Sequence, residues 1–159
     1  MRRVLSLLLA VAVLAGCSTG GKSAPEPGSP AGPVKAMTHA EAQALAAKYR
    51  DEALTVTGDP ASGEPTAQLL PCEGPHTFTA ITSLDVSAPA DQQAAVLQKL
   101  REHYAGAKYT VAPPSTDGSD HGALNVTSPE RVMITIGANA ADALRISVAT
   151  PCYSSDEAM

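Results

Sequence analysis

The sequence predicts a single small α+β domain, with two helices packed on one face of a mainly antiparallel sheet of about five or six strands. Apolar side chains recur at spacings of three and four in two segments, 38–57 and 89–106, which is typical of amphipathic helices. The remaining segments are rich in β-branched residues and are separated by short turns, which favours strands. We therefore expect one layered domain over residues 37–153, followed by a disordered tail over 154–159.

Both expected helices have recognisable ends. The first begins with Thr38-His39-Ala40-Glu41, a capping box in which the threonine oxygen and the glutamate carboxylate satisfy free amides, and it ends before the loop that starts at Gly58. The second opens at Pro89, which suits a first helical turn, and Asp91 lies at the positive end of its dipole. Gly106 is the expected stop.

Six segments are expected to form the sheet. They are 68–72, 77–86, 108–112, 123–127, 131–137 and 143–150. In the second of them, apolar and polar side chains alternate with Ile81 as the exception, so one face should be buried and the other solvated. The connections 128–130 and 138–142 are too short for crossovers, and the last three strands should therefore form an antiparallel meander.

The amino terminus has the three regions of a secretory signal. Arg2 and Arg3 precede an apolar run over 4–14, which is shorter than the ~20 residues that span a bilayer. The alternatives at this point are an ordinary signal peptide with a chance cysteine near the cut and an uncleaved membrane helix. The length of the run favours a signal peptide that comprises residues 1–16.

The run closes with Leu14-Ala15-Gly16-Cys17, which resembles the lipobox of bacterial lipoproteins. In that family the cysteine thiol receives a diacylglycerol, and signal peptidase II, which recognises the three residues before it, cuts ahead of the cysteine. The resemblance therefore implies a lipid anchor on Cys17 and a protein on the extracytoplasmic face of the cell membrane.

Residues 17–36 are nearly all Gly, Pro, Ser, Ala and isolated charges, and we expect a disordered linker. Flexible-chain scaling for about 20 residues gives a reach of roughly 25 Å. The Ala, Gly and Pro content of the chain is similar to that of small lipoproteins of high-GC Gram-positive bacteria. In a Gram-negative host, an aspartate directly after the lipidated cysteine is associated with retention in the inner membrane. This position is Ser18, so the outer membrane would be expected in such a host.

With Cys17 assigned to lipid, Cys72 and Cys152 remain, and an exported pair is expected to form a disulfide between the first strand and the last. Closing a ring of about 80 residues contributes roughly 4.5 kcal/mol in the chain-entropy model. The alternative is a zinc site that uses His76 together with the two cysteines. No paired Cys/His knuckle completes that site, so we expect no metal.

Charge argues against nucleic acid as a partner. The formal net charge is −5, and loss of Arg2 and Arg3 with the signal peptide takes it to −7. An acidic domain without a Lys/Arg stripe has no electrostatic footprint for phosphates, so its attachment to the membrane should depend on the lipid alone.

The longest polar connection, 113–122, is the one loop with a candidate site, formed by Asp117, Asp120 and His121. A calcium loop of EF-hand type would need a glutamate where Ser128 stands, so a solvated loop is the expectation.

Catalytic motifs are missing, and the four histidines are scattered, with His39 and His103 expected on helix surfaces. We predict that the protein is not an enzyme and uses no cofactor. The leading hypothesis is a tethered module that binds an unknown protein or component of the cell envelope. The alternatives are a carrier of a small molecule or lipid, with a cavity between helices and sheet, and a hydrolase built on Asp120 and His121.

Overall fold

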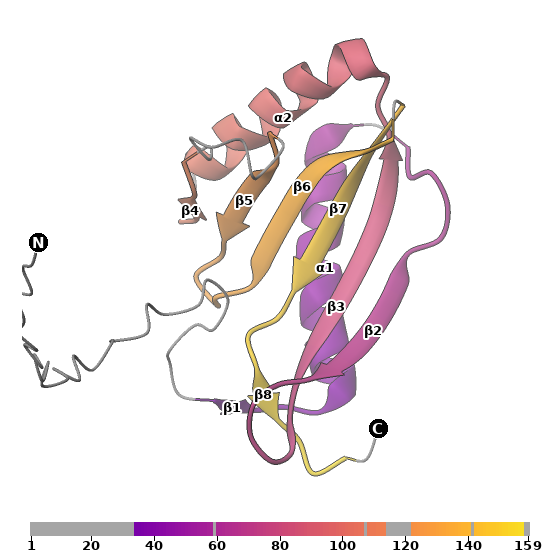
Figure 1. Cartoon of the computed structure of the whole chain (residues 1–159). Coiled ribbons are helices and arrows are strands. Elements are labelled where there is room, and N and C mark those ends of the chain that lie inside the picture. Colours follow the sequence, from indigo (N-terminus) through magenta and orange to yellow (C-terminus); the bar gives the residue numbers. More distant parts are fainter. Residues whose placement is uncertain (1–33, 59, 107, 114–121, 141, 158–159) are drawn as a thin grey trace, which may run out of the picture.

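The computed structural model describes residues 34–58, 60–106, 108–113, 122–140 and 142–157 (Figure 1). The helices are α1 (His39–Thr57) and α2 (Ala90–Ala105). The strands are β1 (Lys35–Ala36), β2 (Thr66–Pro71), β3 (Thr77–Ser87), β4 (Thr110–Val111), β5 (Leu124–Thr127), β6 (Met133–Ala140), β7 (Ala143–Ala149) and β8 (Tyr153–Ser154). They form one sheet in the order β1-β8-β3-β7-β6-β5-β4, with β2 on the other side of β3.

The α+β class is confirmed, whereas the strand count and the pairing of the sheet are not as predicted. In the described part of the chain the sheet has eight strands instead of five or six, and it is mixed, because β1 runs parallel to β8. The other pairs are antiparallel, and β5, β6 and β7 form the predicted meander. The additional strands have two residues each, too few for a periodic pattern to reveal them in the sequence.

Strand pairing also corrects both expected ends of the domain. Lys35 and Ala36, expected in the linker, pair with Tyr153 and Ser154. The expected tail continues this contact, since Ser155 is buried and the Glu157 carboxylate accepts a hydrogen bond from the His39 amide. The two ends of the described chain therefore lie at the same short strand pair.

Helix α1 forms as predicted at its amino end. The Glu41 amide donates to the Thr38 hydroxyl over 3.1 Å, and the Thr38 amide donates to the Glu41 carboxylate over 2.8 Å. At the other end Gly58 has a φ of 76°, and the Lys99 ammonium of α2 donates to the Thr57 carbonyl over 3.1 Å. A cation at a helix carboxyl end also favours the helix dipole.

Both helices cover the same face of the sheet, with α1 behind the strands in Figure 1. One core cluster contains Tyr49 and Ala53 from α1, Leu100 and Tyr104 from α2, and apolar residues from β3, β5, β6 and β7. A smaller cluster lies at the end near β8 and contains Ala42, Phe78, Ala80 and Tyr153. The interior of the two-layer domain is filled by these side chains.

Neither α1 nor α2 covers the opposite face of the sheet, which we call the open face. Small polar side chains form a ladder across it: the Ser83 hydroxyl lies 3.2 Å from that of Ser147, and the Thr135 hydroxyl donates to Asn125 over 3.0 Å. Further along, Arg145 donates twice to Asp85, over 2.9 and 3.0 Å. The open face is therefore ordered by its own cross-strand contacts.

Candidate binding groove at the disulfide

A groove of about 470 Å³ lies on the open face, at the place where β7 ends at Ala149 and its neighbour β6 begins at Met133. Pairing between β3 and β7 ends at Ile81 and Ala149, and the register then shifts by one residue before Phe78 pairs with Tyr153 of β8. Strand β6 begins at Met133, opposite Ala149, so it does not accompany the chain over residues 150–152. The step between the sheet and this uncovered segment forms the groove.

Thr150 fixes the shift in register. Its amide donates to the Ala80 carbonyl over 2.9 Å, and its side-chain oxygen accepts the Ala80 amide over 3.0 Å in place of a backbone carbonyl. The Thr79 hydroxyl donates to the Thr150 carbonyl over 2.7 Å. With these groups satisfied inside the protein, the segment is held in place without a neighbouring β6 strand.

We call this site the disulfide groove, and ten of the described residues line it. They are Cys72, Glu73, Thr79, Thr127, Arg131, Met133, Ala149, Thr150, Pro151 and Cys152. Apolar side chains and the disulfide form much of the surface, threonines supply hydroxyls, and one acidic and one basic residue come from two different turns. Ligand sites commonly combine an apolar lining with a few polar groups in this way.

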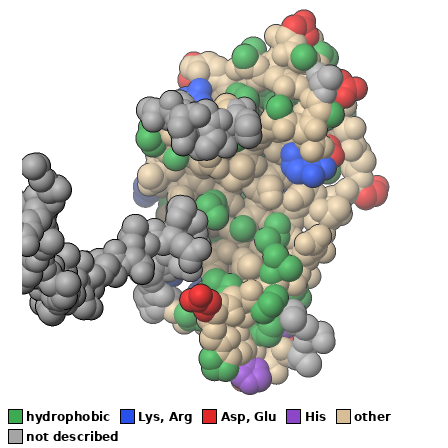
Figure 2. Space-filling model, in the orientation of Figure 1, with side chains coloured by type: hydrophobic (Ala, Val, Ile, Leu, Met, Phe, Trp, Pro, Cys, Tyr) green, Lys and Arg blue, Asp and Glu red, His purple; other side chains and the backbone are tan. Residues whose placement is uncertain are grey.

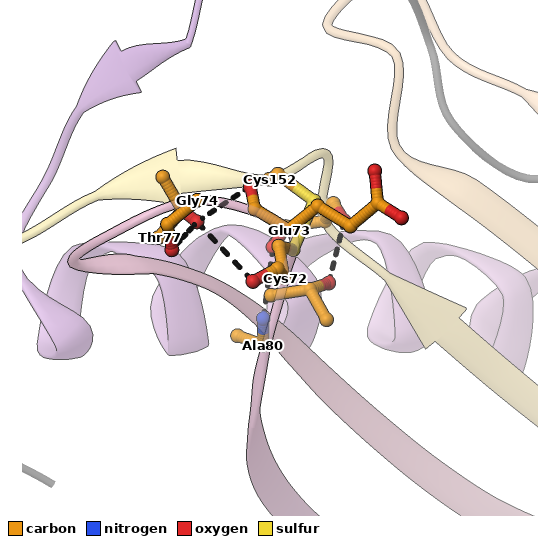
Figure 3. The surroundings of a disulfide bond; sticks show 8 residues. Cys72, Glu73, Gly74, Thr77, Ala80 and Cys152 are labelled. Atoms are coloured by element: carbon orange, nitrogen blue, oxygen red, sulfur yellow. Dashed lines mark hydrogen bonds between the residues drawn. A yellow bond between two sulfur atoms is a disulfide. The ribbon is translucent and has the colours of Figure 1, made fainter.

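The predicted disulfide between Cys72 and Cys152 is confirmed, with 6.2 Å between the Cα atoms. Figure 3 shows the turn beside it, where the Thr77 hydroxyl lies 2.8 Å from the Gly74 carbonyl and 3.0 Å from that of Glu73. The Cys72 amide donates to the Thr77 carbonyl over 2.9 Å. Because the two sulfurs are bonded to each other, the zinc alternative is wrong in this structure.

Arg131 reaches the groove from an unusual backbone conformation. It ends the turn between β5 and β6 with a φ of 64°, in the left-handed region that favours glycine. Its amide donates to the Ser128 carbonyl over 2.8 Å, and the Ser128 side chain accepts the Val132 amide over 3.1 Å. A non-glycine residue in this region costs about 1 kcal/mol or more, and such costs concentrate at functional sites.

The sequence pattern does not predict the groove, although one irregularity in that pattern lies beside it. Ile81 was the exception to alternation because it lies on the open face, next to Ala149 and, one strand further, Met133. Met133 is 45% exposed, which is high for a large apolar side chain. Figure 2 shows hydrophobic side chains gathered on the lower half of this face, near the groove.

The sequence-predicted loop site remains a prediction. Asp117, Asp120 and His121 lie outside the described residues, as do Leu14, Ala15, Gly16 and Cys17. In the described part of the chain, no group of three or more His, Cys, Asp or Glu residues is arranged to hold a metal ion.

His39 corrects another expectation, because its side chain is only 13% exposed instead of lying on the helix surface. Its Nδ1 lies 2.9 Å from the Tyr153 hydroxyl, and its ring packs edge-on against Phe78. His103 is exposed as predicted, with Nε2 3.3 Å from Glu52. The position of His39 joins α1 to the carboxyl-terminal segment.

A second cluster of polar groups joins α1 to the sheet edge. The Tyr109 hydroxyl lies 2.7 and 2.8 Å from the two carboxylate oxygens of Glu52, and the Tyr49 hydroxyl donates to Glu130. Burial and the bond to Glu130 raise the pKa of Tyr49 to about 12. A tyrosine with such a pKa stays protonated near neutral pH, so this cluster is best explained as a structural contact.

Comparison with known proteins supports the amino-terminal prediction. Residues 1–18 match the model of the prokaryotic membrane lipoprotein lipid attachment site. A search of curated proteins found no match. Among solved structures, a DUF4853 family protein from Actinomyces odontolyticus is similar at 12% identity and a TM-score of 0.37, with 75% of this chain and 66% of that chain covered.

The attachment site makes the protein a membrane-anchored lipoprotein. Within the described residues, no helix has both the length and the apolar character needed to cross a membrane. The structural likeness to the DUF4853 protein is too weak to carry a statement about function.

Proposed function

We propose that this lipoprotein is a non-catalytic binding module of the cell envelope, and that its ligand is a protein segment or envelope component that places apolar groups in the disulfide groove. The observation that carries the proposal is the groove itself, about 470 Å³ with a largely apolar surface, on a sheet face that neither α1 nor α2 covers. A lining of Met133, Ala149 and Pro151 offers contact area without reactive groups.

The chemistry of the lining supports binding over catalysis. No histidine is among the ten lining residues, and both lining cysteines are in the disulfide, so the described part of the groove supplies neither an imidazole base nor a thiol nucleophile. Glu73 and Arg131 lie on different turns and bring side chains of opposite charge to the lining of the groove. That the protein is not an enzyme remains a prediction.

Two features argue against nucleic acid. The formal net charge is −5, and proteins that bind single strands normally stack bases on aromatic side chains. Phe78 and the four tyrosines belong to the helix side of the sheet, where they pack in or against the two core clusters. The open face therefore offers no stacking platform.

The carrier hypothesis has less support. It needs a cavity between the helices and the sheet, but fully buried side chains such as Leu100, Tyr104 and Ile134 occupy that layer. A ligand between the layers would have to displace well-packed atoms, at a cost of several kcal/mol.

The location on the extracytoplasmic face is part of the same proposal. It is supported by the signal peptide and by the disulfide, since disulfides persist mainly in oxidising compartments. Accessibility of the anchored domain to protease in intact spheroplasts tests it, and a fully protected domain would contradict it.

Site-specific photo-crosslinking tests the binding proposal. A photoreactive amino acid replaces Met133 in the membrane-anchored protein, and the matched control carries it at Ala94, an exposed position on α2. We expect an adduct at position 133 that is absent at position 94. The substitution Ala149→Arg, which places a long charged side chain in the groove, should reduce the yield of that adduct.

Equal labelling at positions 133 and 94 would contradict the proposal, as would an adduct that Ala149→Arg leaves unchanged. Circular dichroism of each variant confirms that the domain remains folded.

A further inference from the structure

We infer that β2 is a self-association edge, through which two copies of this chain pair antiparallel to form one continuous sheet. This interface is separate from the disulfide groove. It depends on the backbone groups that β2 directs away from β3, and on the spacing of the two prolines that bound them.

Strand β2 is the longest unpaired edge in the described part of the sheet. Strands β1 and β4, at the ends of the strand order, have two residues each, whereas β2 has six and pairs with β3 alone. Natural proteins usually protect such an edge with charges, and residues 66–70 (Thr-Ala-Gln-Leu-Leu) contain none. Five of the six residues of β2 are exposed, including Leu70 at 42%.

The pairing with β3 fixes which backbone groups point outward. The Cys72 amide donates to the Thr77 carbonyl, so positions 72, 70, 68 and 66 direct their N–H and C=O groups toward β3. Alternation then directs those of Ala67 and Leu69 away from the sheet. Pro65 and Pro71 bound the segment and have no N–H, so Ala67 and Leu69 supply its outward donors.

One register satisfies all of these groups at once. When Gln68 faces Gln68 of a second copy, Ala67 lies opposite Leu69 and Leu69 opposite Ala67, which gives four backbone hydrogen bonds. The register is centred on a residue, so opposed side chains share a face, as a continuous sheet requires. A shift by two residues in either direction places a proline opposite Ala67 or Leu69, and because proline has no N–H, the outward carbonyl of that residue is left without a donor.

Side chains fit the same arrangement. Leu69 lies on the helix side of the sheet, and in this register it meets Ala67 of the other copy. On this helix side, a groove of about 270 Å³ between α1 and β2 is lined in part by Ala44, Ala47 and Ala67. On the open face Leu70 meets Thr66. Two acidic chains can meet at this uncharged segment without like charges on directly opposed residues of 66–70, and anchoring in one membrane raises their local concentration.

Cysteine crosslinking on membranes tests the register. With Cys17 lipidated and Cys72 bonded to Cys152, an introduced cysteine is the free thiol of the mature chain. Residues at a non-hydrogen-bonded antiparallel position have Cα atoms about 4.5 Å apart, within disulfide range. We therefore expect oxidation of the full-length Gln68→Cys protein to give a disulfide-linked dimer at several times the yield of Thr66→Cys.

Thr66→Cys is the matched control, because the two copies of Thr66 lie four residues apart in this register, roughly 13 Å along the strands. Chains carrying Thr66→Cys and Leu70→Cys, expressed together, should crosslink to each other. Ala67→Pro removes an outward N–H without removing a bond to β3, and should reduce the Gln68→Cys dimer at least fivefold.

Equal crosslinking of Gln68→Cys and Thr66→Cys would overturn the inference, as would a Gln68→Cys adduct whose mass identifies a different protein. A dimer yield unchanged by Ala67→Pro would also overturn it. If Ala67→Pro lowers the unfolding midpoint, the mixed Thr66→Cys and Leu70→Cys pair decides, and its failure to crosslink refutes the register. Loss of ligand labelling at position 133 would leave these outcomes unaffected.

Discussion

Removal of the disulfide should destabilise this domain more than removal of any surface contact. The bond joins residues separated by 80 positions, so its loss releases a long loop in the unfolded chain. The chain-entropy model assigns a ring of this size about 4.5 kcal/mol, and measured values often fall below the model, so we expect a loss of about 3 to 4.5 kcal/mol for Cys72→Ser with Cys152→Ser. Small domains are stable by about 5 to 15 kcal/mol in total.

Urea unfolding of the mature, lipid-free chain measures this loss. With an m-value of about 1.5 kcal/mol/M, the midpoint should fall by about 2 to 3 M. The wild-type chain with its disulfide reduced is the matched control, because it loses the bond but keeps both sulfur atoms at the groove. It should unfold close to the double variant.

A midpoint shift of less than about 0.7 M, corresponding to roughly 1 kcal/mol, would refute the reasoning. It would mean that β8 and the turn after β2 are held by their other contacts alone. A large effect in the double variant without one in the reduced wild type would assign the loss to the serine substitutions instead of the bond.

Three further substitutions test other parts of the structure by the same unfolding measurement. Thr38→Ala removes the capping box of α1 and should cost about 1 kcal/mol, and an unchanged midpoint would contradict the role of the cap. Hydrogen bonds from Arg145 hold the pKa of Asp85 below its ordinary value, so this pair stabilises the fold above about pH 4 and stops doing so as the pH falls through the lowered pKa. Because both side chains are partly exposed, Asp85→Asn should cost less than about 1 kcal/mol at pH 7, and a difference from wild type that grew on acidification would refute this sign. Tyr104 is fully buried and its hydroxyl has no hydrogen-bond partner among the described residues, so Tyr104→Phe should be neutral or stabilising by up to about 1 kcal/mol, and a loss above 1 kcal/mol would indicate a bonded hydroxyl.

Local signals predicted the long elements of this fold. The capping box at Thr38 located the start of α1, and alternation over 77–86 located β3, because buried and exposed faces impose a fixed period on long strands. Counting cysteines predicted the disulfide, since lipidation of Cys17 left one pair.

Features that depend on register could not be read from local pattern. Strands β1 and β8 have two residues each, and their pairing depends on contacts between the two ends of the chain. The disulfide groove exists because β6 begins opposite Ala149, a relation between strands that no single segment encodes. The left-handed residue Arg131 also carries no turn signal, because glycine or asparagine normally marks that conformation.

The parallel pair of β1 and β8 determines how tension on the lipid anchor enters the domain. A pull from the membrane reaches β1 through Val34, and β1 is held by β8 and by the hydrogen bond that the Met37 amide donates to the Ser154 carbonyl over 3.0 Å. From β8 the load passes through the disulfide between Cys152 and Cys72. From β1 it passes along the chain to α1, at the capping box of Thr38 and Glu41. Strands β5 and β6 pair with neither β1 nor β8 and lie further along the strand order. We therefore expect Met133, on β6, to keep its place in the groove while the anchor is under mechanical load.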